Sequence, residues 1–248
     1  MDTLRVVTYN VHKCRGLDRR VIPDRIAAVL KETGGDVIAL QEVLSIEGHG
    51  HEQHQARCIA EALGMDYRIG ENRRLNGGAY GNVTLSRLPL LKAENFDITW
   101  RGRERRGALR TDFQLKENAP VHVFNIHLGT AYIERRFQGR KLVSEEILNH
   151  PELAGPRIIV GDFNEWTNGL ASRLLASHFK SADLRYHLSR ARTYPGILPL
   201  VHLDHVYYDD TLELKRLTLH RSRTALIASD HLPLVADFAL RQTKIQTG

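Results

Sequence analysis

Short apolar runs recur along the whole chain, and each is closed by residues that favour turns. Runs of this length and composition predict β-strands. The predicted strands are Leu4–Tyr9, Val37–Leu40, Val83–Ser86, Leu109–Leu115, Val121–Ile126, Arg157–Val160, Val206–Tyr208, Leu212–Leu219 and Leu234–Leu240. Stretches with helical spacing lie between them, at Asp24–Glu32, Gln53–Leu63, Glu134–Leu148 and Gly169–Leu175.

The order of these elements favours an α+β fold. Strands outnumber helices and the two do not alternate strictly, so packed mixed sheets covered by helices fit better than a doubly wound parallel sheet or a barrel of alternating units. No linker rich in Pro, Gly or Ser divides the chain, and no repeat appears. We therefore expect residues 1–248 to form a single domain.

Composition narrows the class of protein. The chain has 248 residues, of which 42% are hydrophobic, and a formal net charge of +6. These values are typical of a soluble globular protein. No apolar run approaches the roughly 20 residues of a membrane-spanning helix, and the first residues lack the apolar core of a secretory signal, so we expect a cytoplasmic protein. Two cysteines, Cys14 and Cys58, are too few for a disulfide framework.

Arginines gather in two stretches. The first follows the first predicted strand and contains Arg15, Arg19, Arg20 and Arg25. The second is Arg101–Arg110, beside Trp100. Guanidinium groups attract and grip phosphates, so nucleic acid, phospholipid headgroups and phosphorylated metabolites are candidate partners. Solvated surface faces are the alternative interpretation of both stretches.

Polar residues able to bind a metal or a phosphate come directly after four of the apolar runs. They are Asn10, Glu42, His127 and the pair Asp162 and Asn164. Strand ends that a sheet brings together form a rigid floor from which such side chains can converge. Each one alone would be interpreted as a turn residue, an exposed strand end or a buried, hydrogen-bonded histidine.

Asp162 and Asn164 are two residues apart, so in an extended segment their side chains point to the same side. The carboxylate can orient or deprotonate a water, and the amide can donate a hydrogen bond to charge that develops on a phosphate. A capped turn is the alternative, because Asp and Asn favour turns.

Two Asp-His neighbourhoods lie near the C-terminus, at Asp204-His205 and at Ser229-Asp230-His231. A histidine that acts as a general base needs an acceptor at its second ring nitrogen. Adjacent residues in an extended chain rarely serve each other in this way. We therefore expect a pair between the two segments, Asp204 with His231.

The types of candidate ligand favour a hard divalent cation. Asn10, Glu42, Asp162, Asn164 and Asp230 all offer oxygen, and no cysteine joins them. Mg²⁺, with Mn²⁺ as a second possibility, prefers such donors and takes further ligands from water and substrate phosphate. Zinc is less favoured, because the histidines at 49, 51 and 54 lie in a glycine-flanked stretch that is typical of a loop.

Six motifs, in this order, resemble those of the endonuclease/exonuclease/phosphatase superfamily, and the resemblance spans nearly the whole chain. They are Thr8-Tyr9-Asn10, Leu40-Gln41-Glu42, Asn125-Ile126-His127, Gly161-Asp162-Phe163-Asn164, Asp204-His205 and Ser229-Asp230-His231. The superfamily includes deoxyribonucleases, abasic-site endonucleases, inositol polyphosphate phosphatases and neutral sphingomyelinases, and this chain is most similar to its small bacterial branch. The resemblance implies two packed mixed β-sheets flanked by helices, a four-layer α/β/β/α sandwich.

The resemblance also implies a role for each motif residue. The implied metal ligands are Asn10, Glu42 and Asp230, with Glu42 as the principal ligand. The implied catalytic residues are His127, Asp162, Asn164, Asp204 and His231. Asp162 and His231 would activate water, Asp204 would orient His231, Asn164 would stabilise the pentacovalent transition state, and His127 would contact phosphate. The implied reaction is in-line hydrolysis of a phosphoester without a covalent intermediate.

Weaker similarities to the bacterial branch lie in Gly81–Pro89, Arg106–Leu109 and Glu134–Gln138. They suggest Arg87 and Arg135 as substrate-phosphate contacts, although a charge at a strand end is the simpler interpretation of Arg87. The expected activity is that of a magnesium-dependent hydrolase, most simply a phosphodiesterase. A nuclease, a phospholipid phosphodiesterase and a small-molecule phosphatase all stay open. A non-catalytic module that binds nucleic acid or phosphate on the same fold is the alternative from another class.

Overall fold

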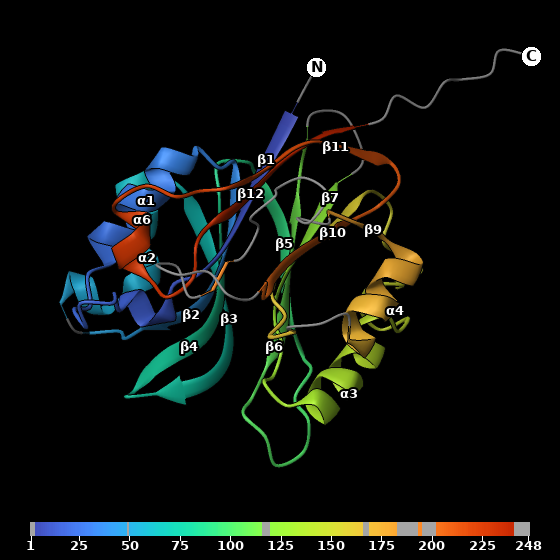
Figure 1. Ribbon diagram of the computed structural model, residues 1–248, viewed down its shortest axis with the longest axis horizontal. Coiled ribbons are helices and arrows are strands. Elements are labelled where there is room, and N and C mark those ends of the chain that lie inside the picture. The colour runs from blue at the N-terminus through green and yellow to red at the C-terminus, as the bar shows by residue number, and fades with distance from the viewer. Residues whose placement is uncertain are drawn as a thin grey trace, which may run out of the picture.

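A computed structural model describes residues 3–48, 50–115, 120–165, 169–182, 193–194 and 202–240. Two mixed six-stranded sheets pack face to face, and helices cover the outer face of each (Figure 1). The α+β prediction and the predicted order of layers, α/β/β/α, are confirmed. Within the described ranges, no helix is long and apolar enough to span a bilayer.

The first sheet has β1 and β2 near its centre, and these two strands are parallel while the other neighbours are antiparallel. In spatial order its strands are β11 (Leu212–Leu219), β12 (Leu234–Leu240), β1 (Thr3–Asn10), β2 (Val37–Ser45), β4 (Gly78–Ser86) and β3 (Asp66–Leu75). The helices that pack on its outer face are α1 (Pro23–Thr33), α2 (Gln55–Leu63) and the short α6 (Ala225–Ala228).

The second sheet repeats this plan, with β7 and β8 as its parallel pair. Its strands, in spatial order, are β5 (Leu90–Asp97), β6 (Gly107–Phe113), β7 (Val121–His127), β8 (Arg157–Asp162), β10 (Asp204–Tyr208) and β9 (Lys180–Ser181). The outer face packs against α3 (Tyr132–Leu142) and α4 (Leu170–His178).

Side chains of the central strands alternate between two apolar layers. On β1, Val7 packs under the helices while Val6 packs between the sheets, and on β8 Ile159 and Ile158 divide in the same way. Successive residues of a strand point to opposite faces, so a strand buried on both faces carries a continuous apolar run. This is why the central strands could be predicted as apolar runs.

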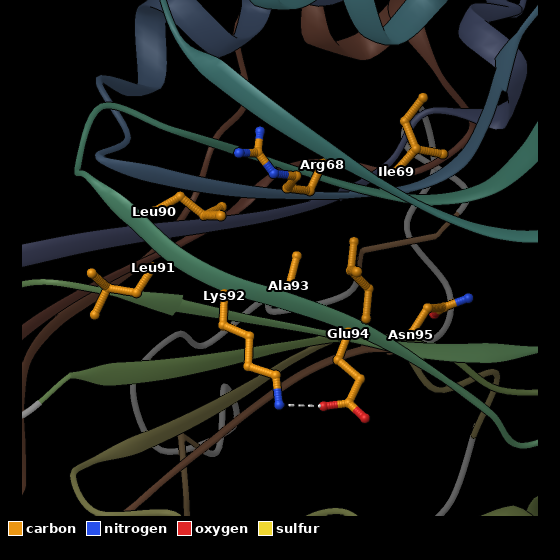
Figure 2. Close-up of a pocket in the computed structure, with 9 residues that line it drawn as sticks. Arg68, Ile69, Leu90, Leu91, Lys92, Ala93, Glu94 and Asn95 are labelled. Carbon is orange, nitrogen blue, oxygen red and sulfur yellow. Dashed lines mark ion pairs between the residues drawn. The ribbon is translucent and has the colours of Figure 1, made fainter.

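The two polar edge strands, β3 and β5, were not predicted. Most of their side chains are exposed or half-buried, so their sequences lack an apolar run. A pocket of about 410 Å³ lies between these strands, and no predicted site residue lines it (Figure 2).

Three of the four predicted helices differ from the observed ones by two residues or more at an end, and the cause is clear for two of them. The predicted helix Glu134–Leu148 ends at Leu142, because Ser144 and Asn149 hydrogen-bond to the backbone carbonyls of Lys141 and Val143 and turn the chain. The predicted helix Gln53–Leu63 begins at Gln55, since Nδ1 of His54 accepts the backbone N–H of Arg57 and caps it.

Two fully buried asparagines tie the sheets together. Nδ2 of Asn125, on β7, donates to the carbonyl oxygens of Leu40 and Val83 in the other sheet, each at 3.0 Å. Nδ2 of Asn82, on β4, donates in the opposite direction to the carbonyl oxygens of Gly107 and Asn125, also at 3.0 Å. Because a buried amide is costly unless it is hydrogen-bonded, this reciprocal amide pair fixes how the two sheets face each other.

Replacement of Asn125 by alanine should lower the free energy of unfolding by about 2–3 kcal/mol, because two buried carbonyls lose their donor and a small cavity forms. Urea denaturation measures the change. Asn95→Ala is the matched control, since the amide of Asn95 is exposed and donates to the carbonyl of Glu71. The control should shift stability by less than about 1 kcal/mol, and equal effects would refute the role of the amide pair.

Candidate active site

The layer between the sheets becomes polar at one edge of the sandwich. Asn10, His127 and Asp162 end β1, β7 and β8, and their side chains point to the same face as Val6 and the other apolar residues between the sheets. Since β1 and β2 are parallel, as are β7 and β8, the C-terminal ends of all four strands meet at this edge. Polar side chains from both sheets therefore converge there.

Asn10 joins the carboxylates of the two sheets. Its Nδ2 lies 3.0 Å from Oδ2 of Asp162 and 3.3 Å from Oε1 of Glu42. The Nζ of Lys13 lies 3.0 Å from the other oxygen of Glu42. Burial opposes ionisation of Glu42. The positive charge that His127 carries when it is protonated at low pH, the charge of Lys13 and these hydrogen bonds outweigh it and hold the pKa of Glu42 well below its usual range. Glu42 therefore presents a full negative charge.

His231 and Asp204 form the pair expected between the two C-terminal segments. Nδ1 of His231 lies 3.0 Å from Oδ2 of Asp204, and its Nε2 lies 3.6 Å from Oδ2 of Asp162. Burial alone would lower the pKa of His231, but the carboxylates of Asp204, Asp162 and Asp230 raise it to about 10. Burial raises the pKa of Asp162, with the charge of Asp204 adding to the effect. The three groups form one buried unit that can hold or release a proton.

Asn164 links the turn after β8 to the turn after β7. Its Nδ2 donates to the carbonyl oxygen of Leu128 at 2.9 Å and lies 3.2 Å from Nε2 of His127. Its backbone N–H donates to Oδ1 of Asp162 at 2.8 Å. Burial, together with the charge of Arg106, lowers the pKa of His127 to about 3, so this imidazole is neutral near pH 7 and Nε2 can accept from the amide.

Asp230 reaches the group from the segment after α6. Oγ of Ser229 donates to the carbonyl oxygen of Asn10 at 2.8 Å, which anchors this segment to the end of β1. Oδ2 of Asp230 lies 3.2 Å from Nδ1 of His12. Burial opposes ionisation of Asp230, yet the hydrogen bond from His12 and the charge of His231 lower its pKa. The structure thus brings together all eight residues predicted as catalytic or metal-binding.

The backbone around these residues adopts uncommon conformations. Seven non-glycine residues in the described ranges have a positive φ, and five of them lie in this region: His12 (46°), Lys13 (58°), Cys14 (56°), Glu42 (58°) and Asn164 (48°). Left-handed backbone costs about 1–2 kcal/mol for most residues and tends to occur at functional sites. Three of the five are consecutive and form the turn η1 (His12–Cys14), which brings His12 and Lys13 to the carboxylates.

The structure does not bring Arg87 to this group. Its backbone N–H donates to the carbonyl oxygen of Asp36, just before β2 begins. Val37 begins β2 and Glu42 lies five residues further on, so Arg87 is separated from the site by roughly 16 Å of strand. Its place fits the simpler interpretation as a charge at a strand end.

Arg135, by contrast, lies beside the site on α3. Its Nη1 donates to the carbonyl oxygens of Gly129 and Thr130, in the turn that follows His127, and its Nε lies 3.8 Å from Oε1 of Glu165. Arg135 thus connects the turns that carry His127 and Asn164.

Of two cationic residues near the site, Lys13 was not singled out from the sequence, and Arg106 was named only within the arginine stretch and the weaker similarity at Arg106–Leu109. Lys13 follows the Asn10 motif closely, but only the left-handed turn directs it to Glu42. Arg106 belongs to an arginine stretch whose members at 101, 103 and 105 are exposed, while the Arg106 side chain is 7% exposed and lies 2.9 Å from Oε2 of Glu104. A buried arginine cannot be distinguished from its exposed neighbours by composition.

The remaining histidine and cysteine candidates lie outside this group. His54 caps α2, and its Nε2 lies 2.9 Å from Oε1 of Glu47. The residue at 49 and the side chain at 51 lie outside the described part of the structure. Cys14 and Cys58 are buried free thiols, as expected for a chain without a disulfide framework.

The donors at this edge suit a hard cation that is held loosely by the protein. Among the residues that the structure describes, no three His, Cys, Asp or Glu side chains form a cage for a metal ion. Mg²⁺ does not need one, because one or two carboxylates, several waters and substrate phosphate complete its coordination. An ionised Glu42 beside the amide of Asn10 fits this requirement.

Asp204→Asn should lower the pKa of His231 from about 10 towards the ordinary value near 6.5, because the main charge that holds its proton is removed while the side-chain shape stays. An NMR pH titration of the histidine ring resonances, with EDTA present, measures the shift. Glu145→Gln, at an exposed position in the turn after α3, should leave the titration unchanged. An unaltered His231 titration in Asp204→Asn would contradict the pairing.

Comparison with known proteins agrees with this fold. Protein YbhP of Escherichia coli K12 is 29% identical over 252 residues, which covers 96% of this chain and 97% of YbhP. An endonuclease/exonuclease/phosphatase structure from Beutenbergia cavernae has a TM-score of 0.76 at 23% identity and covers 97% of this chain and 72% of that one. A mannosyl-6-phosphatase from Bacteroides thetaiotaomicron has a TM-score of 0.74 at 18% identity and covers 96% of this chain and 100% of that one. Residues 7–231 match the endonuclease/exonuclease/phosphatase family, and the chain therefore belongs to it.

Proposed function

We propose that this protein is a Mg²⁺-dependent phosphodiesterase that hydrolyses its substrate by in-line attack of an activated water. Membership of a family of phosphoesterases supports the reaction class. The observation that carries the proposal is the buried unit of His231, Asp204 and Asp162, which lies against the ionised Glu42 through Asn10.

Glu42 and Asn10 would hold the cation, with Asp230 completing its water network. The cation supplies charge neutralisation for the phosphate and for the departing oxygen. These residues come from the end of β1, from the bulge inside β2 and from the segment after α6, so they approach from the first sheet. The substrate phosphate would then lie between them and the residues of the second sheet.

Asp162 and His231 are placed to activate the water. Their facing atoms are 3.6 Å apart, so one water can hydrogen-bond to both and give up its proton to the pair. Asp204 fixes which ring nitrogen of His231 faces Asp162, because it binds the other one. The direction of attack is thus set by a rigid, buried support rather than by a mobile loop.

Asn164 and His127 would contact the phosphoryl oxygens opposite the cation. The Nδ2 of Asn164 carries two hydrogens. One is donated to the carbonyl oxygen of Leu128, and the other, which lies towards Nε2 of His127, can be donated instead to an oxygen whose charge grows in the transition state. Arg106 adds positive charge on this side of the site, since its charge contributes to the lowered pKa of His127. A negatively charged substrate therefore meets cationic or neutral donors on this side.

Asp162→Asn and His231→Ala should each lower kcat/KM for bis(p-nitrophenyl) phosphate by about 1,000-fold or more with Mg²⁺ present. The first removes the carboxylate that accepts the water's proton, and the second removes the imidazolium that positions the water and Asp162. The matched controls are Asp210→Asn and His178→Ala, two exposed positions away from the site, which should keep normal rates. EDTA should abolish turnover of the unaltered protein. Normal turnover in Asp162→Asn would refute the assignment, and phosphate binding without hydrolysis under any condition would favour a non-catalytic binding module.

Arg106→Ala should raise KM for the same diester about tenfold or more and change kcat less, because a buried charge that attracts the phosphate is removed. Arg105→Ala is the control, since its side chain is exposed next to it in the chain. Steady-state kinetics separate the two constants. Equal effects of the two substitutions would show that Arg106 acts only through the general positive charge of this stretch.

A further inference from the structure

Exposed large apolar side chains gather beside the candidate site. Six stand out among the described residues: Leu17, Val21, Leu91, Tyr132, Ile133 and Ile227. Five of these lie next to segments that carry site residues, and only Leu91, on the edge strand β5, lies elsewhere. Single exposed apolar residues are normal on a protein surface, but a set concentrated around one site indicates an interaction surface.

Three of the five form one patch, which we call the loop patch (Leu17, Val21 and Ile227). The backbone N–H of Leu17 donates to the carbonyl oxygen of Ile227 at 3.0 Å, and Val21 pairs with Arg15 in a β-bridge. These side chains are 40%, 52% and 45% exposed, respectively. The loop patch is therefore brought together by defined backbone contacts between residues 15–21 and α6.

The loop that carries the patch is internally braced. Arg25 binds Asp18 with two hydrogen bonds, of 2.8 and 3.0 Å, and the backbone N–H of Gly16 donates to the carbonyl oxygen of Arg20 at 3.0 Å. A side chain at Gly16 would collide with Arg25 and with the carbonyl of Ile227. These contacts therefore hold the loop in one conformation, in which its apolar side chains stay exposed.

The two segments that form the loop patch, residues 15–21 and α6, both adjoin segments that carry site residues. The turn η1 precedes residues 15–21 directly, and it contributes Lys13 to Glu42. Ile227 lies three residues before Asp230 in the other segment. A surface that docked on the loop patch would lie beside the cation-binding residues.

Positive charge surrounds these apolar side chains. Arg15, Arg19 and Arg20 are exposed, and none forms an ion pair with a carboxylate in the described part of the chain. The fourth arginine of this stretch, Arg25, is neutralised by Asp18. Unpaired arginines next to exposed aliphatic residues are complementary to an anionic bilayer, which attracts the charges and accepts the apolar side chains.

Nucleic acid fits this surface less well. Single-stranded nucleic acid is held by aromatic rings on which bases stack, and the loop patch contains only aliphatic side chains. On the opposite flank of the sandwich, Tyr132 and Ile133 are also exposed where α3 begins, a few residues after His127 (Figure 1). Apolar side chains on both flanks of the site favour a surface that can receive them on both sides, as a bilayer does.

We infer that the loop patch and its arginines dock this protein on an anionic phospholipid bilayer, which presents headgroup phosphodiesters to the site. The inference rests on the proposed function for the identity of the substrate but not for the binding itself. Docking and hydrolysis can therefore be measured separately.

Sedimentation with vesicles of phosphatidylglycerol and phosphatidylcholine in equal parts, in EDTA, tests the docking. The protein should bind these vesicles, and the triple variant Leu17→Ser, Val21→Ser and Ile227→Ser should bind at least tenfold more weakly. Leu91→Ser is the control, because it removes a leucine that is more exposed (54%) than any residue of the loop patch and lies away from the site, and it should bind normally. Thermal unfolding of each variant confirms that it is folded.

The charge contribution is tested by Arg19→Glu with Arg20→Glu. Loss of each arginine should weaken binding to the anionic vesicles roughly fivefold, and charge reversal should weaken it further. This variant keeps the inference testable even if the triple variant fails to fold. Equal binding to pure phosphatidylcholine, or full binding by the folded triple variant, would overturn the inference. Binding of single-stranded DNA without vesicle binding would assign the arginines to nucleic acid and overturn it too.

Hydrolysis of a soluble diester distinguishes this inference from the proposed function. Turnover of bis(p-nitrophenyl) phosphate without any vesicle binding would leave the phosphodiesterase assignment standing and refute the docking surface. Vesicle binding without turnover of any diester would refute the enzymatic assignment and support the surface. Faster hydrolysis of phosphatidylglycerol in vesicles than in detergent solution, lost in the triple variant, would support both.

Discussion

The site depends on the reciprocal pair of buried amides between the sheets. Asn125 reaches from the second sheet to carbonyls of the first, and Asn82 reaches from the first sheet to carbonyls of the second. Apolar contacts alone allow two sheets to slide over each other, because dispersion and hydrophobic burial have no direction. Four directional hydrogen bonds in a buried layer select one alignment.

That alignment matters because the site is assembled from both sheets. Asn10 and Glu42 belong to the first sheet, whereas Asp162 and Asp204 belong to the second, and the amide of Asn10 closes the gap at 3.0 Å. A displacement of one sheet by a single ångström would break this contact. Gln41, which directly precedes Glu42, also helps to fix this alignment, because its Nε2 donates to Oδ1 of Asn125 at 2.8 Å.

The sequence was informative where burial is complete and less so elsewhere. The central strands are buried on both faces and carry apolar runs, so they and the polar residues at their ends could be predicted, as could the pairing of Asp204 with His231. The polar edge strands β3 and β5 could not. Arg87 shows a second limit, because β4 is antiparallel to β2 and its end therefore lies at the opposite edge. Strand direction is a property of the sheet as a whole, which no local motif contains.

At the three residues of the left-handed turn η1, the stability of the backbone and the geometry of the site make opposite demands. Glycine adopts this conformation without strain, whereas each side chain in this turn adds strain to the backbone. The chain instead has His12, Lys13 and Cys14, and two of their side chains contact the carboxylates of Asp230 and Glu42. A substitution that relaxes this turn would stabilise the protein but disturb the site, so thermostabilisation of this protein should leave the turn unaltered and begin elsewhere.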